Sequence, residues 1–490
     1  MTRRVVLRRQ LNTFDVTSLV VGSIIGADIY VAATLGARLV GPASLLVWLL
    51  AGVMATMIAL SFSHCAAILP KVGGPYSYVK EVAGPFCGFI VGWALLLAEW
   101  LSLAVFPVAF TQYLFSFIPN PGQYFEILSK GVFILIILIT NVFGTKATGR
   151  FNDMLTIGKL TPLLLLVCGG LWFITANPAT ALSNFQPFIK GDAGSFGQAL
   201  VLIFWAYAGF ELSTLPADEI QRPKRTIPKA IVAGMLIVTA FYLVTNFVIV
   251  STVDQATLIA SSTPLMVAAA RAFSLSLTLS QIGGLVVGVG ALISIMGADE
   301  SGTIGTSRLA FAMSIDGLLP EVFSRLHRRF RTPYVGLILI CSTAFIASIL
   351  GTLSSLINAA VFLLALAYLS TAVSTILLEK KYPNASKDLK WRELIPVMAA
   401  AFSVVLATQV DVKQILISLL LVVTGIPIYT FFSPKKELRQ LKEIFLSRDA
   451  VLWRAFAQGE RFLAHPVRHI EWLVHRTRRI ERAWQIEEGS

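Results

Sequence analysis

The chain of 490 residues is strongly apolar: 56% of its residues are hydrophobic, 14% are charged, and its mean hydropathy is +0.75. This composition excludes an ordinary soluble protein and predicts an all-α protein embedded in a lipid bilayer. A net charge of +13 would suit a nucleic-acid partner, but the positions of the charges along the chain argue against one.

Twelve apolar stretches are long enough to cross a membrane, which takes roughly 20 apolar residues. They are centred near residues 27, 56, 101, 135, 163, 205, 240, 295, 342, 366, 400 and 421. The basic start runs into the first stretch without a small-residue cleavage site, so we expect that stretch to remain in the mature protein. Shorter helices are expected within residues 70–85 and 262–273.

The basic residues favour one orientation of these stretches. With the N-terminus in the cytoplasm, all but six of the 40 Lys and Arg residues fall on cytoplasmic segments or in the tail. The positive-inside rule therefore predicts that both termini are cytoplasmic, in the cell or plasma membrane. The basicity reflects membrane topology, so no nucleic-acid partner is expected.

The sequence divides into four parts. Residues 1–13 form a cytoplasmic start, 14–378 a ten-helix core, 379–432 two additional transmembrane helices, and 433–490 a cytoplasmic tail. In the tail, apolar residues recur near helical spacing and arginines occupy the other face, which predicts a basic amphipathic helix. Two roles for this helix stay open: lying on the anionic inner leaflet, or packing as a solvated or oligomer-forming helix.

Two of the apolar stretches are interrupted. VGSIIGADIY, residues 21–30, carries glycines and Asp28, and IFWAYAGFEL, residues 203–212, carries an Ala-Gly pair followed by Glu211. Hydrocarbon tolerates unpaired backbone groups only where they face protein or a water-lined cavity. Two such breaks in corresponding halves predict a transporter with a binding site near the middle of the membrane.

The chemistry of the breaks suits a zwitterion. The N–H groups released from Gly26 to Asp28 would attract a carboxylate, while carbonyls released at Ile24, Trp205 and Ala208 would attract an ammonium group. An amino acid carries both groups on one carbon. For a single glycine such as Gly22, close helix packing is the competing explanation. The candidate substrate-binding residues are Ser23, Ile24, Gly26, Ala27, Asp28, Phe204, Trp205, Ala208 and Gly209.

Ionisable residues within the apolar stretches are candidates for function because each is costly in hydrocarbon. Apolar surroundings disfavour the charged form of Lys159, which could then exchange a proton near neutral pH, although a lysine that snorkels to the interface is the alternative. Glu211 could relay protons or hold the breaks together. Glu99 either faces the substrate cavity or is a paired core carboxylate, and Asp299 and Glu300 are conceivable partners of Lys159.

Four segments carry a resemblance to a known superfamily. They are GSIIGADIY, ILPKVGGPYSYVKEVAGPFCGFIVGW, FWAYAGFELSTLPADEIQRPKRTIPKAI and SRLAFAMSIDGLLPEVFSRLHRRFRTP. The chain resembles the amino acid, polyamine and organocation transporter superfamily. The resemblance implies twelve transmembrane helices, a five-plus-five inverted repeat with broken helices one and six, and alternating access. It also implies that Trp205 is an aromatic lid and that Lys159 stands where sodium-coupled members hold an ion.

Asp28 departs from the resemblance, because the relatives usually carry glycine there. A carboxylate beside the anion-attracting N–H groups would repel a substrate carboxylate unless it is protonated or points away. Three interpretations stay open: the substrate is cationic or an amine, Asp28 titrates during transport, or Asp28 caps the second half-helix.

We therefore expect a secondary active transporter of amino acids, working as a proton-coupled symporter or an exchanger, with Lys159, Glu211 and Asp28 as candidate proton-coupling residues. The alternative is a polyamine or organic-cation transporter, motivated by the carboxylates Asp28, Glu99 and Glu211. A membrane enzyme is not expected, because the sequence shows no nucleophile, metal cluster or phosphate-binding loop near an interface.

No cofactor or metal is expected either. The four cysteines show no metal-ligand spacing and are interpreted as small core residues. The loop 117–124 contains no cysteine, so a disulfide-linked subunit is not expected, and the oligomeric state stays open.

Overall fold

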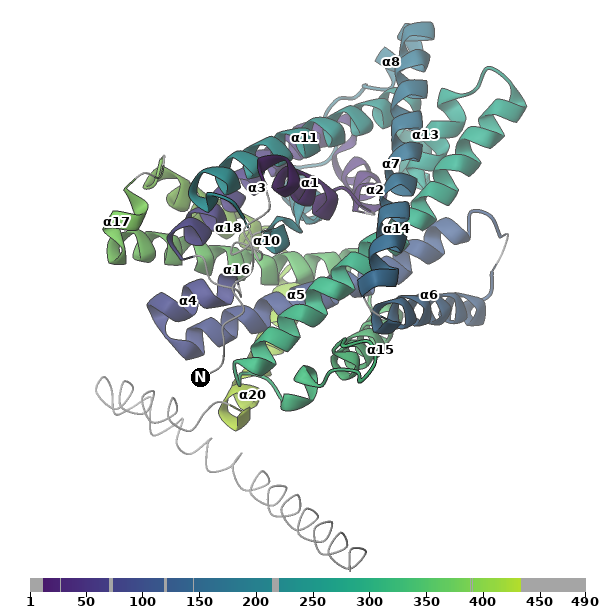
Figure 1. Cartoon of the computed structure of the whole chain (residues 1–490). Helices are drawn as coiled ribbons and strands as arrows, with labels where there is room; N and C mark the ends of the chain where they lie inside the picture. Colours follow the sequence, from purple (N-terminus) through teal and green to yellow (C-terminus); the bar gives the residue numbers. More distant parts are fainter. Residues whose placement is uncertain are drawn as a thin grey trace, which may run out of the picture. The chain divides into compact units, whose positions relative to one another are not determined.

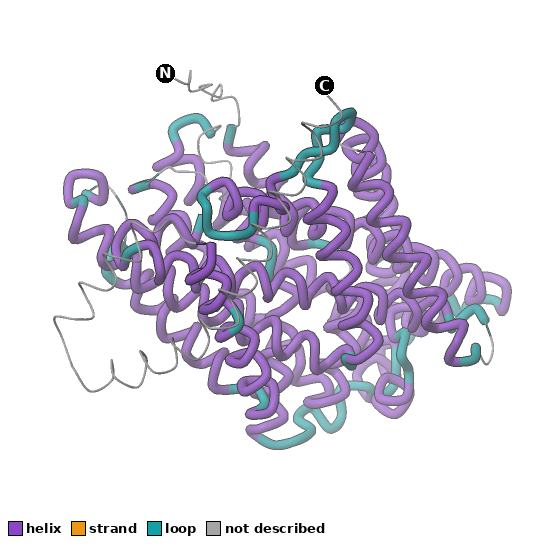
Figure 2. Tube along the Cα trace, turned by 90° about the horizontal axis from the view of Figure 1, so that it is seen from below, coloured by secondary structure: helices purple, strands orange, loops and turns teal. Residues whose placement is uncertain are grey.

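A computed structural model describes residues 12–432 except 27, 70–73, 119–120, 144, 214–219, 388 and 390. The side chains of residues 19, 145–160, 212–213 and 223–224 also lie outside the described part. Within it the regular elements are helices (Figure 2). The predicted tail, residues 433–490, and the start of the chain up to residue 11 lie outside the described residues.

The helices follow one another with short connections. In chain order they are α1 (Thr13–Ile24), α2 (Asp28–Val40), η1 (Gly41–Ala43), α3 (Ser44–Ile68), α4 (Pro75–Ala83), α5 (Pro85–Leu114), α6 (Gln123–Phe143), α7 (Thr145–Ala176), α8 (Pro178–Ser183), α9 (Ala193–Phe204), η2 (Trp205–Tyr207), α10 (Phe210–Ser213), α11 (Pro223–Thr252), α12 (Gln255–Ala260), α13 (Pro264–Ala272), α14 (Leu277–Ile315), η4 (Glu321–Ser324), α15 (Tyr334–Leu350), α16 (Leu353–Lys381), α17 (Pro383–Ser386), α18 (Leu394–Thr408), α19 (Val412–Val423) and α20 (Gly425–Phe432). The short helices predicted within residues 70–85 and 262–273 are α4 and α13.

Seven segments of the described chain are long and apolar enough to cross a membrane, and five shorter apolar helices accompany them. The shorter helices are α1, the second half of α7 from Thr161 to Ala176, α9 with η2, α15 and α18. This supports a multi-pass membrane protein. The twelve-span arrangement and the boundaries of the four parts stay predictions.

Both predicted interruptions are present in the structure. The first helix stops at Ile24, Ile25 is extended with ψ 103°, and α2 begins at Asp28. In the second, α9 passes into a single 3-10 turn, Ala208 is extended with ψ 158°, and Gly209 has φ +112°. The chain therefore leaves the helical conformation at both places and resumes it within a few residues.

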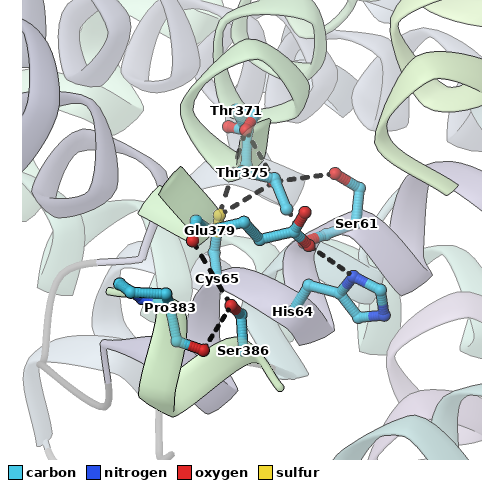
Figure 3. Close-up of polar contacts among 8 residues, drawn as sticks. All are labelled: Ser61, His64, Cys65, Thr371, Thr375, Glu379, Pro383 and Ser386. Atoms are coloured by element: carbon cyan, nitrogen blue, oxygen red, sulfur yellow. Dashed lines mark hydrogen bonds and ion pairs between the residues drawn. The ribbon is translucent and has the colours of Figure 1, made fainter. Parts of the chain in front are cut away.

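The interruptions are enclosed by long helices that lie side by side in pairs: α3 with α11, α5 with α16, and α7 with α14 (Figure 1). Polar side chains also join helices that belong to different pairs. Between α3 and α16, the hydroxyl oxygens of Ser61 and Thr375 are 2.8 Å apart, and His64 Nδ1 lies 3.2 Å from Glu379 Oε1 (Figure 3). Such buried hydrogen bonds stabilise helix pairs where lipid supplies no hydrophobic driving force.

Small residues allow other helices to approach closely. At the crossing of α7 and α14, a Cβ atom added to Gly290 would lie only 2.5 Å from Cβ of the rigid Pro162 ring. Neither the backbone at residue 290 nor the proline ring can move aside unless a whole helix shifts. The glycine therefore determines how closely α7 and α14 pack.

We expect Gly290→Ala to lower the free energy of unfolding by about 1–3 kcal/mol, because the methyl group overpacks the α7–α14 crossing. Gly131→Ala in α6 is the matched control, since its added Cβ would meet only the Phe345 ring at 3.6 Å, an ordinary contact. The thermal midpoint of each purified variant in detergent measures the effect. Equal midpoints for the two variants would show that the crossing is not tightly packed.

Candidate functional site

The two helix interruptions are held together by one buried tyrosine. The hydroxyl of Tyr242, on α11, lies 2.9 Å from the carbonyl oxygen of Ile24 and 3.1 Å from that of Ala206. Both carbonyls lie where a helix ends, so they lack their regular helical partners. The tyrosine proton is shared between these two acceptors, and Tyr242 thereby links the first break to the second.

A cavity of about 90 Å³ lies between the breaks. Most of the predicted site residues line it: Ser23, Gly26, Asp28, Glu99, Trp205, Ala208, Gly209 and Glu211. Ile24 and Phe204 are buried beside it but do not line it. Ala27 lies outside the described residues. The remaining lining side chains come from α5, α14 and α16, and they include Ser102, Phe106 and Ser301.

The indole of Trp205 covers one side of the cavity. Its Nε1 donates to Ser102 Oγ at 3.1 Å, and its ring centroid lies 5.8 Å from that of Phe106. Trp205 is only 2% exposed. Ser102 and Phe106, both on α5, contact its indole ring. Sequence reasoning did not identify Ser102 or Phe106, because neither belongs to an interrupted stretch and neither carries a charge.

Glu211 binds the backbone of the second break. Its two carboxylate oxygens accept the N–H of Gly209 at 3.1 and 3.0 Å, and Oε2 also accepts the hydroxyl of Tyr368 at 3.1 Å. The side chain of Glu211 is 1% exposed. These contacts fasten Glu211 to its own break, and the two predicted roles of Glu211, relaying protons or holding the two breaks together, stay predictions.

Glu99 and Glu211 form a pair, because their carboxyl groups are hydrogen-bonded to each other. An ionised carboxylate can only accept hydrogen bonds, so two carboxyl groups bond directly only when one of them carries a proton. A direct bond between Glu99 and Glu211 therefore requires one of the two carboxyl groups to be protonated. The sequence identifies both residues as candidates but not their partnership, which depends on how α5 packs against the second break.

The remaining predicted ionisable residues are placed as follows. Asp28 is the first residue of α2 and is 9% exposed, a position where a carboxylate interacts favourably with the helix dipole. On α14, Glu300 accepts the hydroxyl of Thr140 at 2.6 Å, and Asp299 lies 3.4 Å from Thr303 Oγ1. The side chain of Lys159 lies outside the described residues, so its role and its pairing with α14 stay predictions.

The break at Gly209 requires glycine. Its φ of +112° is strained for any residue with a side chain, and an added Cβ would lie 2.7 Å from the carbonyl oxygen of Ser23 in the first break. The backbones of the two breaks therefore touch at this point, and no movable side chain lies between them.

We expect Gly209→Ala to weaken binding of a labelled amino acid by at least about tenfold, because the methyl group forces the two breaks apart. Gly194→Ala is the matched control, since its Cβ would have an ordinary contact of 3.5 Å with Asp192. Scintillation-proximity binding to purified protein gives the comparison. Unchanged affinity in Gly209→Ala would mean that the contact between the breaks does not shape the cavity.

Comparison with known proteins finds transporters, several of them named for amino acids. A methylthioribose transporter of Bacillus subtilis, 27% identical and covering 80% of this chain and 87% of the relative, is also among them. Residues 11–440 match the family model described as amino acid permease. The serine/threonine exchanger SteT of Bacillus subtilis is 27% identical over 444 residues, covering 88% of this chain and 98% of the relative. The branched-chain amino acid permease BcaP of the same organism is 27% identical, covering 88% and 94%. The human cystine/glutamate transporter is 28% identical, covering 88% and 86%.

The match spans almost all of the described chain, including both interruptions and the cavity between them. It confirms the superfamily resemblance found in the four sequence segments. These relatives are transporters, not enzymes. The chain belongs to the amino acid permease family.

Proposed function

We propose that this chain is a secondary active transporter that binds a zwitterionic amino acid between its two helix breaks and works by alternating access. The observation that carries the proposal is a cavity lined by residues of both breaks, whose backbones meet at Gly209 and Ser23. The names of the relatives, which refer to several amino acids, support the same substrate class. Both termini are proposed to lie on the cytoplasmic side of the cell membrane.

The N-terminus of α2, at the first break, is the proposed site for the substrate carboxylate. The second break cannot supply Gly209 N–H for this purpose while Glu211 holds it. The start of α2 remains, where the helix dipole places partial positive charge. The substrate ammonium group then faces the released carbonyls and the Glu99–Glu211 pair.

Proton coupling is proposed to act through this pair. When a second proton neutralises Glu211, its hold on Gly209 N–H weakens, because a neutral carboxyl is a poorer acceptor than a carboxylate. The released N–H becomes available to the substrate carboxylate. Proton binding and substrate binding then favour each other, which is the thermodynamic requirement for symport.

We expect Glu211→Gln to abolish the stimulation of uptake by an inward proton gradient, because the amide keeps the shape of the side chain but cannot titrate. Substrate counterflow without a gradient should stay within about threefold of wild type, less than 1 kcal/mol. Uptake into proteoliposomes with and without the gradient measures both. Glu126→Gln, at a carboxylate outside the cavity that pairs with Lys130, is the control.

Lys159→Ala belongs in the same assay, because the sequence predicts a coupling role for this lysine as well. Acid stimulation that survives in Glu211→Gln and disappears in Lys159→Ala would move the coupling role from the carboxyl pair to Lys159.

The alternative substrate class is a polyamine or other organic cation, since Asp28, Glu99 and Glu211 all line the cavity. We expect proteoliposomes to accumulate labelled leucine or serine and not putrescine, because Glu211 is already engaged by Gly209 N–H and Tyr368. Asp28→Gly, which removes the remaining carboxylate, tests charge selection by that side chain. Uptake of putrescine with no uptake of any amino acid would refute the amino acid assignment.

A further inference from the structure

A second cavity, of about 250 Å³, lies between α6, α14, α15 and the loop that precedes α15. Its polar wall is formed by Asn141, Ser307, Arg308, Arg331 and Thr332. Its apolar wall includes Phe311. None of these residues lines the cavity between the helix breaks.

Within the described part of the chain, the two arginines of this cavity have no carboxylate beside them. Among the described residues, no carboxylate lies within 4.0 Å of the guanidinium of Arg308 or Arg331, and neither group donates a hydrogen bond. From 308 to 331 the sequence holds five arginines and two acidic residues. One of these acids, Asp316, is already engaged by Lys80 at 4.0 Å and by the Tyr76 hydroxyl at 3.3 Å. The segment thus carries excess positive charge at the cavity.

The loop that bears Arg331 is folded around His327. The N–H of His327 donates to the carbonyl of Thr332 at 2.8 Å, and the N–H of Arg331 donates back to the carbonyl of His327 at 2.9 Å. Nδ1 of His327 accepts the N–H groups of Arg329 and Phe330, each at 3.3 Å. The loop is therefore closed by its own hydrogen bonds.

The same loop is fastened to the end of α6 and holds Arg331 in a strained conformation. Thr332 Oγ1 donates to the carbonyl of Val142 at 2.8 Å. Arg331 has φ +59°, in the left-handed region that residues with a side chain rarely adopt. Strain of this kind persists where the surroundings impose it, and it occurs preferentially at binding sites.

The helices that surround the cavity also carry exposed apolar side chains. Exposed side chains on α6, α14 and α15 include Phe143, Ile315 and Ile338, with exposed fractions of 55, 64 and 43%. All three lie at the same ends of their helices as the arginines, and these helices include predicted membrane spans. An occupant with a negative head and an apolar body fits this setting.

We propose that the cavity binds the phosphate group of an anionic phospholipid, with Arg308 and Arg331 as its ligands. Guanidinium groups match phosphate oxygens with paired, charge-assisted hydrogen bonds. Asn141 Nδ2 donates one proton to the carbonyl of Ile137 at 3.0 Å and has a second proton for the headgroup. The acyl chains lie along the exposed apolar side chains of α6 and α15. The lipid belongs to the leaflet on the side of the basic loops.

The test compares two double variants of the full chain with the same loss of charge. Arg308→Gln with Arg331→Gln removes both proposed ligands, whereas Arg325→Gln with Arg328→Gln removes two exposed arginines of the same segment that do not line the cavity. Native mass spectrometry of protein released from phosphatidylglycerol nanodiscs counts retained lipid. We expect retention at least about tenfold weaker in the first variant than in the second, as for the loss of charge-assisted hydrogen bonds.

Arg308→Gln alone keeps the test possible if the double variant does not fold, because this position lies within the regular helix α14. A second arm adds inorganic phosphate to protein in phosphatidylcholine nanodiscs and follows the thermal midpoint. A lipid site predicts a rise with phosphatidylglycerol and none with inorganic phosphate. Equal stabilisation by inorganic phosphate would overturn the lipid assignment, and equal lipid loss from both double variants would overturn the site.

Discussion

A peptide group that leaves a helix inside a membrane must find another hydrogen-bond partner, since hydrocarbon offers none and an unmet group costs several kcal/mol. This constraint explains the centre of the molecule. Each break is accompanied by a buried polar side chain aimed at it: Tyr242 at the carbonyls of Ile24 and Ala206, and Glu211 at the N–H of Gly209. The surrounding helices therefore have two roles: they enclose the cavity, and they position these two side chains.

The same groups that stabilise the breaks are those that a substrate must compete with. Gly209 has a single backbone N–H to donate, so Glu211 and a substrate carboxylate cannot both accept a full hydrogen bond from it. Stabilisation of the empty site and binding of the substrate are therefore alternatives, with protonation of the carboxyl pair deciding between them in the proposed mechanism. In this mechanism the N–H of Gly209 keeps Glu211 as its partner in the empty carrier, and the substrate replaces it.

Local features of the fold could be predicted from sequence, whereas long-range pairings could not. Glycines and a carboxylate within apolar stretches predicted both breaks, and proline and glycine punctuation predicted α4 and α13. Tyr242 gave no signal, because an apolar stretch with one tyrosine is typical of any membrane helix, and its partners lie 218 and 36 residues away. The Glu99–Glu211 pair likewise depends on the rotation of α5 about its axis, which hydropathy does not specify. The twelve spans, Lys159 and the tail stay predictions.

The direct backbone contact between Gly209 and Ser23 has a consequence for how such a carrier can change its cargo. Main chain has the same dimensions whatever the residue, so in the proposed binding mode the charged ends of an amino acid meet a surface that mutation can hardly alter. Variation is confined to the walls contributed by α5, α14 and α16, where Ser102, Leu103 and Ser301 are ordinary side chains open to replacement. Diversification of specificity can then proceed by small steps in those three helices while the recognition of the α-amino and α-carboxyl groups is inherited intact.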